Sequence, residues 1–336
     1  MCIVVFLWQA HPLYPLILLN NRDEYHNRAT KAASWWEGNG AEILGGRDEV
    51  RGGTWLACSR DGRVAFLTNV LESHTLPHAR TRGDLPLLFL KSAKSPREFA
   101  EGLTTEGEYY RGFNLVVVDI ESRTMVYMSN RGPKAQGESF HVQEVRPGLH
   151  VVSNASLNSP WHKAERLRGL FQQEMAKFSD KAIALDRIAG AIMKDSVKAP
   201  PALLPRICSP DWELSLSSIF VHVHTPLGVY GTRSITALSV TWSGEVRFYE
   251  LYLEVDSTNA WKDHLFTFNI QQQLHLHKQF HYPWQRHMMK KAKDNWCASK
   301  VNIPNSKTCA KEDCNIHAAF LCIAKTALAT EQGQDM

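Results

Sequence analysis

The residue with the clearest chemical potential in this chain is Cys2, which follows the first methionine and begins the apolar run Cys2-Ile3-Val4-Val5-Phe6-Leu7-Trp8. Because methionine is removed when the next side chain is small, we expect a mature chain that begins with Cys2 and carries both a thiol and a free α-amine. The amine has a reference pKa of about 7.7 to 8.0 and the thiol about 8.5, so the amine can accept the thiol proton near neutral pH. This is the N-terminal nucleophile arrangement. The alternative is that Cys2 is a small hydrophobic residue in a buried strand.

Polar residues that could complete such a site follow the second apolar run, residues 16–20. The tetrad Asn21-Arg22-Asp23-Glu24 comes directly after this run, which we expect to form a strand paired with the one that carries Cys2. We therefore predict that the Cys2 sulfur lies in a polar cleft against the tetrad, at the end of that strand. The glycine pairs Gly45-Gly46 and Gly52-Gly53 follow and permit positive φ or close backbone approach.

Other expected strand ends carry an amide or a cation, at Asn69, Asn154 and Arg233. An arginine can hold a carboxylate through two hydrogen bonds, and an asparagine amide can stabilise a developing oxyanion. The alternative is that arginine–aspartate neighbours, such as Arg22 and Asp23, tie loops together without a chemical role.

The elements expected to position these residues are hairpins and helix pairs. Strands are predicted at 2–8 and 16–20, 54–58 and 64–68, 114–119 and 124–128, and 234–242 and 246–253, with Trp35 and Trp36 in a loop. Ser95-Pro96-Arg97-Glu98 predicts a helix start. Pro160 opens a later helix, and Asp180 caps its partner, which runs through Ile183 to Ile192. Hairpins alternating with helix pairs favour antiparallel sheets covered by helices.

Composition places the chain among globular proteins, since 336 residues with 44% hydrophobic content can bury a substantial core. From Gln271 to the end there are nine Lys and Arg against five Asp and Glu, which leaves 29 of each sign before that point. A neutral body argues against a nucleic-acid partner. An odd number of cysteines, seven, shows no disulfide pattern and favours a reducing compartment. No signal peptide or membrane span is legible, so we expect a soluble intracellular protein.

Residues 271–336 differ from the rest of the chain. They contain a glutamine run, five histidines and a group of lysines without a sustained helical or strand period, which predicts a mobile, low-order basic tail. Cys309 and Cys314 are separated by four residues, a spacing that fits no standard zinc pattern, so no metal site is expected. Residues 1–270 form the predicted domain.

Motifs along residues 1–270 occur in the order found in a known family. They are the start Met1–Phe6, the tetrad 21–24, the run 45–55, Phe113-Asn114-Leu115, Ser153-Asn154, Pro160-Trp161-His162-Lys163, Tyr230-Gly231-Thr232-Arg233-Ser234 and Phe248-Tyr249-Glu250. Through them the chain resembles the Transport and Golgi organisation 2 family, also called NRDE proteins. The resemblance implies an α+β fold, a four-layer α-β-β-α sandwich of antiparallel sheets that is N-terminal nucleophile hydrolase-like.

Two functional classes then compete. The first is an amidase, similar to the choloylglycine and penicillin acylases of the same fold, in which Cys2 attacks a non-peptide C–N bond. By residue type and order, the candidate catalytic residues are Cys2, Arg22, Asp23, Asn154 and Arg233, with Asn69 as a further oxyanion donor. Arg22 and Asp23 are adjacent here, whereas the acylases separate them, so in a strand they should face opposite sides.

The second class is a carrier that holds its ligand in a cleft near Cys2. The resemblance implies a role in secretory traffic, Golgi organisation, lipid homeostasis and haem mobilisation, in the cytoplasm with mitochondria or the Golgi as further locations. No cofactor is required, and the expected partner is a small apolar or amphipathic ligand, haem or lipid. His222 and His224 alternate on an expected strand and are the candidate haem ligands, with a polar surface stripe as the alternative. We favour the carrier and keep the amidase as the alternative hypothesis.

Overall fold

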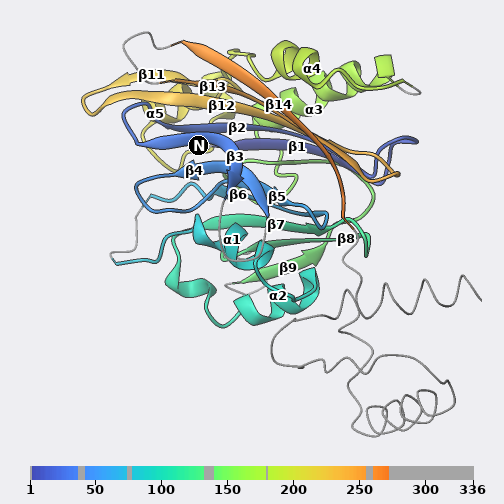
Figure 1. The fold of residues 1–336 in the computed structure, drawn as a ribbon. Helices are drawn as coiled ribbons and strands as arrows, with labels where there is room; N and C mark the ends of the chain where they lie inside the picture. The colour runs from blue at the N-terminus through green and yellow to red at the C-terminus, as the bar shows by residue number, and fades with distance from the viewer. Residues whose placement is uncertain are drawn as a thin grey trace, which may run out of the picture. The chain divides into compact units, whose positions relative to one another are not determined.

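The described part of the chain contains two antiparallel sheets of seven strands each, with helices over their outer faces (Figure 1). The computed structural model describes residues 2–36, 42–73, 78–131, 140–178, 181–254 and 260–271. The described residues all belong to one compact unit, Met1–Gln272. The predicted low-order tail at 271–336 lies outside the described residues, apart from Gln271 itself.

The first sheet has the strand order β10-β1-β2-β12-β13-β14, and β11 pairs with β12. Its strands are β1 (Ile3–Trp8), β2 (Leu16–Tyr25), β10 (Gly148–Val152), β11 (His222–Thr225), β12 (Gly228–Val240), β13 (Glu245–Leu253) and β14 (Trp261–Asn269). The second sheet runs from β3 to β9 in chain order. Its strands are β3 (Thr30–Trp36), β4 (Ile43–Asp48), β5 (Leu56–Ser59), β6 (Arg63–Asn69), β7 (Phe113–Asp119), β8 (Thr124–Ser129) and β9 (His141–Glu144).

The helices lie in two groups. The helices α1 (Asp84–Leu90) and α2 (Pro96–Leu103) pack on the second sheet (Figure 1). The helices α3 (His162–Met175) and α4 (Leu185–Ile192) pack on the first sheet. The short helix α5 (Pro210–Ser215) precedes β11 in the chain. Ser95 and Glu98 form the predicted capping box at the start of α2.

The core consists of three hydrophobic layers, and alternating residues of β1 show why. Val4 and Phe6 pack between the sheets, against Phe66 of β6 among others. Ile3 and Val5 face the opposite side, where they pack against α3 and α4. Because successive side chains of a strand point to opposite faces, a strand buried on both faces requires a layer on each side. The four-layer α-β-β-α sandwich is therefore confirmed.

The predicted hairpins also form. β1 pairs with β2, β5 with β6, β7 with β8 and β12 with β13, all antiparallel. Two of their turns need a glycine, because Gly62 has φ 83° and Gly244 has φ 90°.

Some predicted boundaries are wrong. Trp35 and Trp36 belong to strand β3 and not to a loop; the Trp36 indole Nε1 donates to Gly45 O at 2.8 Å. The helix α4 begins at Leu185 without a side-chain cap, because its N-cap residue is Ala184, whose side chain has no hydrogen-bond acceptor. The proposed cap at residue 180 lies outside the described residues.

The most important correction concerns the polar tetrad 21–24. We predicted it at the end of a strand, but β2 continues through it to Tyr25, and β12 pairs with all of it. The extended partner strand, β12, supplies the backbone hydrogen bonds that keep these polar residues in the sheet. The strand β14, which sequence reasoning missed, adds a further edge beside β13.

Gly53 and Gly169 allow a matched test of how closely the backbone around Gly53 packs against Gly83. A Cβ at Gly53 would lie 2.5 Å from Gly83 C and 2.6 Å from Gly83 O, and Thr54 N already donates to that oxygen. Because backbone atoms cannot rotate away, Gly53→Ala is expected to lower the free energy of unfolding by about 1–3 kcal/mol. In α3, a Cβ at Gly169 meets nothing within 4 Å, so Gly169→Ala should raise it by about 0.5–1 kcal/mol. Urea unfolding measures both, and an unaffected Gly53→Ala protein would contradict the close approach.

Candidate functional site

The site is built on the central strand β2, which pairs with β1 on one side and with β12 on the other. Asn21 lies opposite Ile3, so the tetrad is brought to the start of β1, where Cys2 immediately precedes the strand. On the other side, Arg22 pairs with Ser234 and Asp23 pairs with Thr232.

The register between β2 and β12 shifts at Arg233, which is an extra residue between two paired positions. A bulge of this kind bends the strand and redirects a side chain. Thr232 therefore stays beside Asp23, while Arg233 joins Ser234 and Arg22 in lining one pocket. The adjacent Arg22 and Asp23 face opposite sides, as predicted.

Cys2 lies against the tetrad. Its side chain is buried, and the thiol accepts a hydrogen bond from the Asp23 backbone N–H. Burial raises the pKa of the Cys2 thiol, and the Asp23 carboxylate adds to the rise, whereas the Asp23 N–H and the Arg22 guanidinium oppose it. The sulfur is thus surrounded by charged and hydrogen-bonding groups and is not packed only against hydrocarbon.

Asp23 is fully enclosed on the helix-facing side of the sheet. One carboxylate oxygen, Oδ1, accepts the Thr232 hydroxyl at 2.7 Å. Burial raises the pKa of the Asp23 carboxyl, and the positive charge of Lys163 is the main side-chain influence that opposes the rise. Cys2, Asp23 and Lys163 consequently form one electrostatically coupled group.

Asn154 and Asn69 lie beside this group and contact each other, since Asn154 Nδ2 donates to Asn69 O at 2.8 Å. The Ser153 hydroxyl lies 3.0 Å from Cys2 O and 2.9 Å from Asn154 Oδ1. A hydroxyl has one proton, so Ser153 donates to one of these oxygens at a time. Among the described residues Asn154 Nδ2 donates this one hydrogen bond, to Asn69 O, and the Asn69 side chain is half-buried.

Lys163 is the residue of this site that sequence reasoning missed. It is 3% exposed, and its ammonium Nζ donates to Asn154 Oδ1 and to Leu216 O, each at 3.2 Å. Burial lowers the pKa of Lys163 to about 8. A signal was present, because Lys163, Leu167 and Phe171 recur every four residues and so share the buried face of α3.

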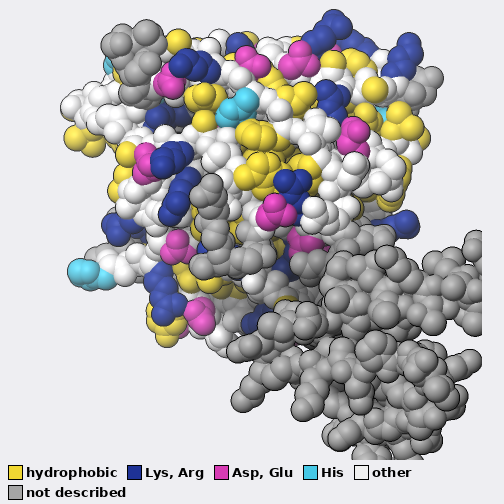
Figure 2. Space-filling model, in the orientation of Figure 1, with side chains coloured by type: hydrophobic (Ala, Val, Ile, Leu, Met, Phe, Trp, Pro, Cys, Tyr) yellow, Lys and Arg dark blue, Asp and Glu magenta, His cyan; other side chains and the backbone are white. Residues whose placement is uncertain are grey.

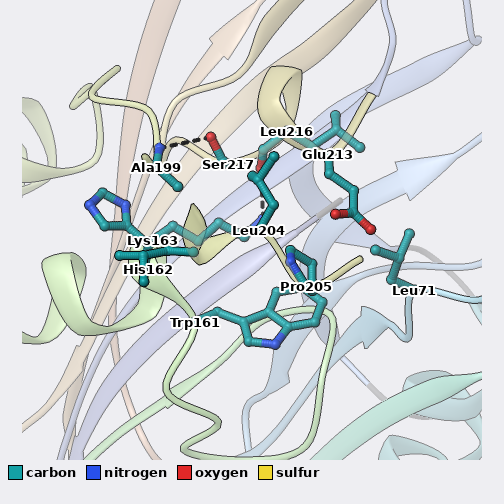
Figure 3. Close-up of a pocket in the computed structure, with 11 residues that line it drawn as sticks. Leu71, Trp161, His162, Lys163, Ala199, Leu204, Pro205, Glu213, Leu216 and Ser217 are labelled. Atoms are coloured by element: carbon teal, nitrogen blue, oxygen red, sulfur yellow. Dashed lines mark hydrogen bonds between the residues drawn. The ribbon is translucent and has the colours of Figure 1, made fainter. Parts of the chain in front are cut away.

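Lys163 also lines a pocket with mainly apolar walls (Figure 3). The figure shows its side chain running between the start of α3 and the segment around Leu204 and Leu216. Leu71, Trp161, Leu204, Pro205 and Leu216 supply apolar surface, and the pocket holds about 350 Å³ of space including the part open to solvent.

His222 and His224, the predicted haem ligands, are not brought to Cys2. Both are exposed on β11, at a sheet edge, with their ring centroids 5.3 Å apart. The His26 ring lies 5.7 Å from that of His222. Burial, together with the positive charge of Arg233, lowers the pKa of His26 to about 4. No group of three or more His, Cys, Asp or Glu suited to a metal ion occurs within the described ranges.

Burial pushes the pKa values of the Cys2 thiol and the Asp23 carboxyl up and that of Lys163 down, so the charged forms of all three are disfavoured. Perturbed pKa values of this kind are typical of functional sites.

Two antiparallel sheets are stacked between helical layers, and Cys2 immediately precedes β1 of the first sheet, so the site lies in a four-layer α-β-β-α sandwich. The chain belongs to the Transport and Golgi organisation 2 family, whose model matches residues 1–255. The mouse Transport and Golgi organization 2 homolog is 31% identical over 284 residues, which are 81% of this chain and 100% of the mouse protein. The predicted family is thereby confirmed.

Two further likenesses are more limited. A stretch of 47 residues, 14% of this chain, is 70% identical to the Ras-related protein Rab7 of Vigna aconitifolia and covers 22% of that protein. Among solved structures, a variant of the conjugated bile acid hydrolase of Clostridium perfringens is 9% identical with a TM-score of 0.44, over 80% of this chain and 98% of that one. Neither likeness indicates an activity for this chain.

The molecular surface is consistent with a chain of small net charge. On the face shown in Figure 2, basic and acidic side chains are interspersed among hydrophobic ones. None of the helices in the described part of the chain has the length and apolar character needed to cross a membrane.

The lowered pKa of Lys163 predicts a pH dependence of stability. Between about 8, the pKa in the fold, and 10.5, the ordinary value, the unfolded chain binds more protons than the folded one, so the free energy of unfolding rises with pH. In Lys163→Met this contribution disappears. We expect the stability of the wild type relative to Lys163→Met to increase across this range by up to about 3 kcal/mol.

Urea unfolding at several pH values measures this difference. Lys177→Met is the matched control, because the Lys177 side chain is 62% exposed. A difference between wild type and Lys163→Met that does not change with pH would contradict the assigned shift.

Proposed function

We propose that this protein serves intracellular transport and Golgi organisation by carrying a small apolar or amphipathic ligand, haem or a lipid. Family membership supports the proposal, because its curated relatives are named for transport and Golgi organisation. Action in the cytoplasm, and at mitochondria or the Golgi, and a part in lipid homeostasis belong to the same proposal.

The observation that supports haem as the ligand is an open hollow beside His224. Tyr25, Trp212, His224 and Leu227 contribute to its lining, and it holds about 970 Å³ of space including the part open to solvent. A haem needs an axial ligand, commonly histidine, and apolar or aromatic surface for its ring. The Trp212 ring lies 5.6 Å from that of Tyr230, so the indole is supported from within the fold.

For a lipid, the pocket beside Lys163 is the better candidate. Leu71, Trp161, Leu204 and Leu216 can contact an acyl chain, and Lys163 lines the same pocket (Figure 3). A mainly apolar lining with a few polar groups is typical of small-molecule sites.

Haem titration tests the proposal. Full-length protein is expected to bind haem saturably, with a shift of the Soret band, because a histidine enters the iron coordination sphere. His224→Ala should weaken binding at least about tenfold, or 1.4 kcal/mol. His141→Ala is the matched control, since this half-buried histidine lies on β9 of the other sheet. Binding no stronger than to an unrelated protein, or unaffected by His224→Ala, would remove the haem version of the proposal.

The second candidate is an N-terminal-cysteine amidohydrolase that acts on a non-peptide C–N bond. The hydrogen bond from the Asp23 N–H to the Cys2 thiol favours it, because it fixes the sulfur beside Asn154 and the coupled Asp23 and Lys163. Removal of Met1 would leave an α-amine to accept the thiol proton.

In this reaction the Cys2 sulfur attacks the carbonyl carbon and the carbonyl oxygen becomes an oxyanion, for which the remaining Asn154 N–H is a candidate donor. The C–N bond then breaks, and the leaving amine takes the proton that the thiol gave up. Water hydrolyses the resulting thioester, which releases the acid and restores the thiol.

Intact-mass measurement and a panel of acyl amides test the amidohydrolase. We expect a mature chain that begins with Cys2, turnover of an acyl amide, and loss of that turnover in Cys2→Ala. Cys58→Ala is the control, because Cys58 is a buried thiol in the layer between the sheets. Retained Met1, or turnover that survives Cys2→Ala, would rule this reaction out.

A further inference from the structure

A third cavity, a pocket, lies between the two sheets, on the face of β2 opposite to Asp23. Arg22, Arg233 and Ser234 from the first sheet, Thr30 of β3 and the Trp55 ring from the second contribute to it. The pocket holds about 260 Å³ of space including the part open to solvent. Because that figure includes open solvent, the enclosed space is much smaller than in sites for drug-sized ligands, so the pocket suits a small head group.

Its two guanidinium groups are buried without a carboxylate partner. Arg22 and Arg233 are each 5% exposed, and neither forms a salt bridge with a described carboxylate. The two nearby carboxylates, Glu24 and Asp48, form ion pairs with Arg28 instead. Arg28 Nη2 lies 2.7 Å from Asp48 Oδ2, and its Nε lies 3.7 Å from Glu24 Oε2. A buried charge without a partner is costly, so the site favours a bound anion.

The two arginines are held in place by other contacts. The Arg22 carbon Cζ lies 4.2 Å from the centroid of the Trp55 ring, and its Nη1 donates to Thr30 Oγ1 at 3.2 Å. Arg233 Nη1 donates to the same hydroxyl at 3.2 Å and to Tyr25 O at 3.2 Å. These bonds fix the orientation of both guanidiniums before any ligand arrives.

Donors remain unused on the pocket side. Arg233 Nε and Ser234 Oγ have no hydrogen-bond partner among the described residues, although the two residues are only 5% and 4% exposed. Burial of a polar group without a partner is unfavourable. The Nε edge of a guanidinium is one that can receive a carboxylate side-on.

Charge decides the class of anion. Glu250 also lines the pocket, and its Oε2 accepts the Ala33 N–H at 2.6 Å and lies 3.2 Å from His264 Nε2. Lys31, at the rim, is 65% exposed and is paired with Glu49. Arg22 and Arg233 face Glu250 here, and the single Arg28 leaves one charge of the Glu24 and Asp48 pair uncompensated, so the site suits a singly charged carboxylate better than a doubly charged phosphate monoester.

The geometry points to a carboxylate-binding site in this pocket, in which Arg22, Arg233 and Ser234 hold the acid group of a small organic acid or of a longer ligand that ends in one. This site is separate from the hollow beside His224. It uses Arg22 and Arg233, which are also candidate catalytic residues of the amidohydrolase, but carboxylate binding there is tested without either proposed function.

Calorimetric titration with propionate tests the site, with propionamide as the neutral analogue of the same shape. Wild type is expected to bind propionate saturably and propionamide at least about tenfold more weakly, because only the acid carries the charge that the arginines lack. Ser234→Ala should weaken propionate binding by about tenfold or more, since it removes a hydrogen bond to a charged group. Because Ser234 Oγ has no partner, this variant should fold with unchanged or higher thermal stability.

Arg233→Lys should also weaken binding, because lysine cannot offer two parallel donors. Arg97→Gln is the control, since the Arg97 side chain is 64% exposed and lies elsewhere. Three results would overturn the inference: no propionate binding by the wild type, equal binding of propionamide, or unchanged propionate affinity in Ser234→Ala. The serine variant decides the matter if Arg233→Lys fails to fold.

Discussion

The pairing of β2 with β1 on one side and with a bulged β12 on the other is the constraint on which the site depends. It brings Cys2 to the polar tetrad, and it separates Asp23 from Arg22 by the alternation of a strand. The extra residue at Arg233 then adds a second guanidinium beside Arg22, while Thr232 stays with Asp23. The strand β2 therefore carries Asp23, which is electrostatically coupled to Cys2 and Lys163, on one side of the sheet and Arg22, which shares a pocket with Arg233, on the other.

Burial is what gives these groups their chemical character. Asp23, Lys163 and Cys2 all lie where their charged forms are disfavoured. Burial therefore raises the pKa values of the Asp23 carboxyl and the Cys2 thiol and lowers the pKa of the Lys163 amine. A fold stabilises such a group only because the surrounding layers are tightly packed. The two outer helical layers and the layer between the sheets supply that packing.

Much of this arrangement could be predicted from the sequence. Period-two apolar runs and glycine turns predicted the hairpins, and the order of motifs predicted the family and the sandwich. The tetrad was placed at a strand end because polar residues usually end a strand, yet the long partner β12 continues the pairing through Tyr25. Lys163 was missed because a single lysine on a helix is ordinarily exposed. The arginine pocket could not be predicted, since the bulge at Arg233 depends on the register between strands 200 residues apart.

A crystal structure with residue 2 resolved tests the central claim most directly. The account predicts that the Cys2 sulfur lies within hydrogen-bonding distance of the Asp23 N–H, with the bulge at Arg233 and both guanidiniums in the pocket between the sheets. A sulfur packed among hydrocarbon side chains, or a regular β12 that turns Arg233 towards the helices, would contradict it.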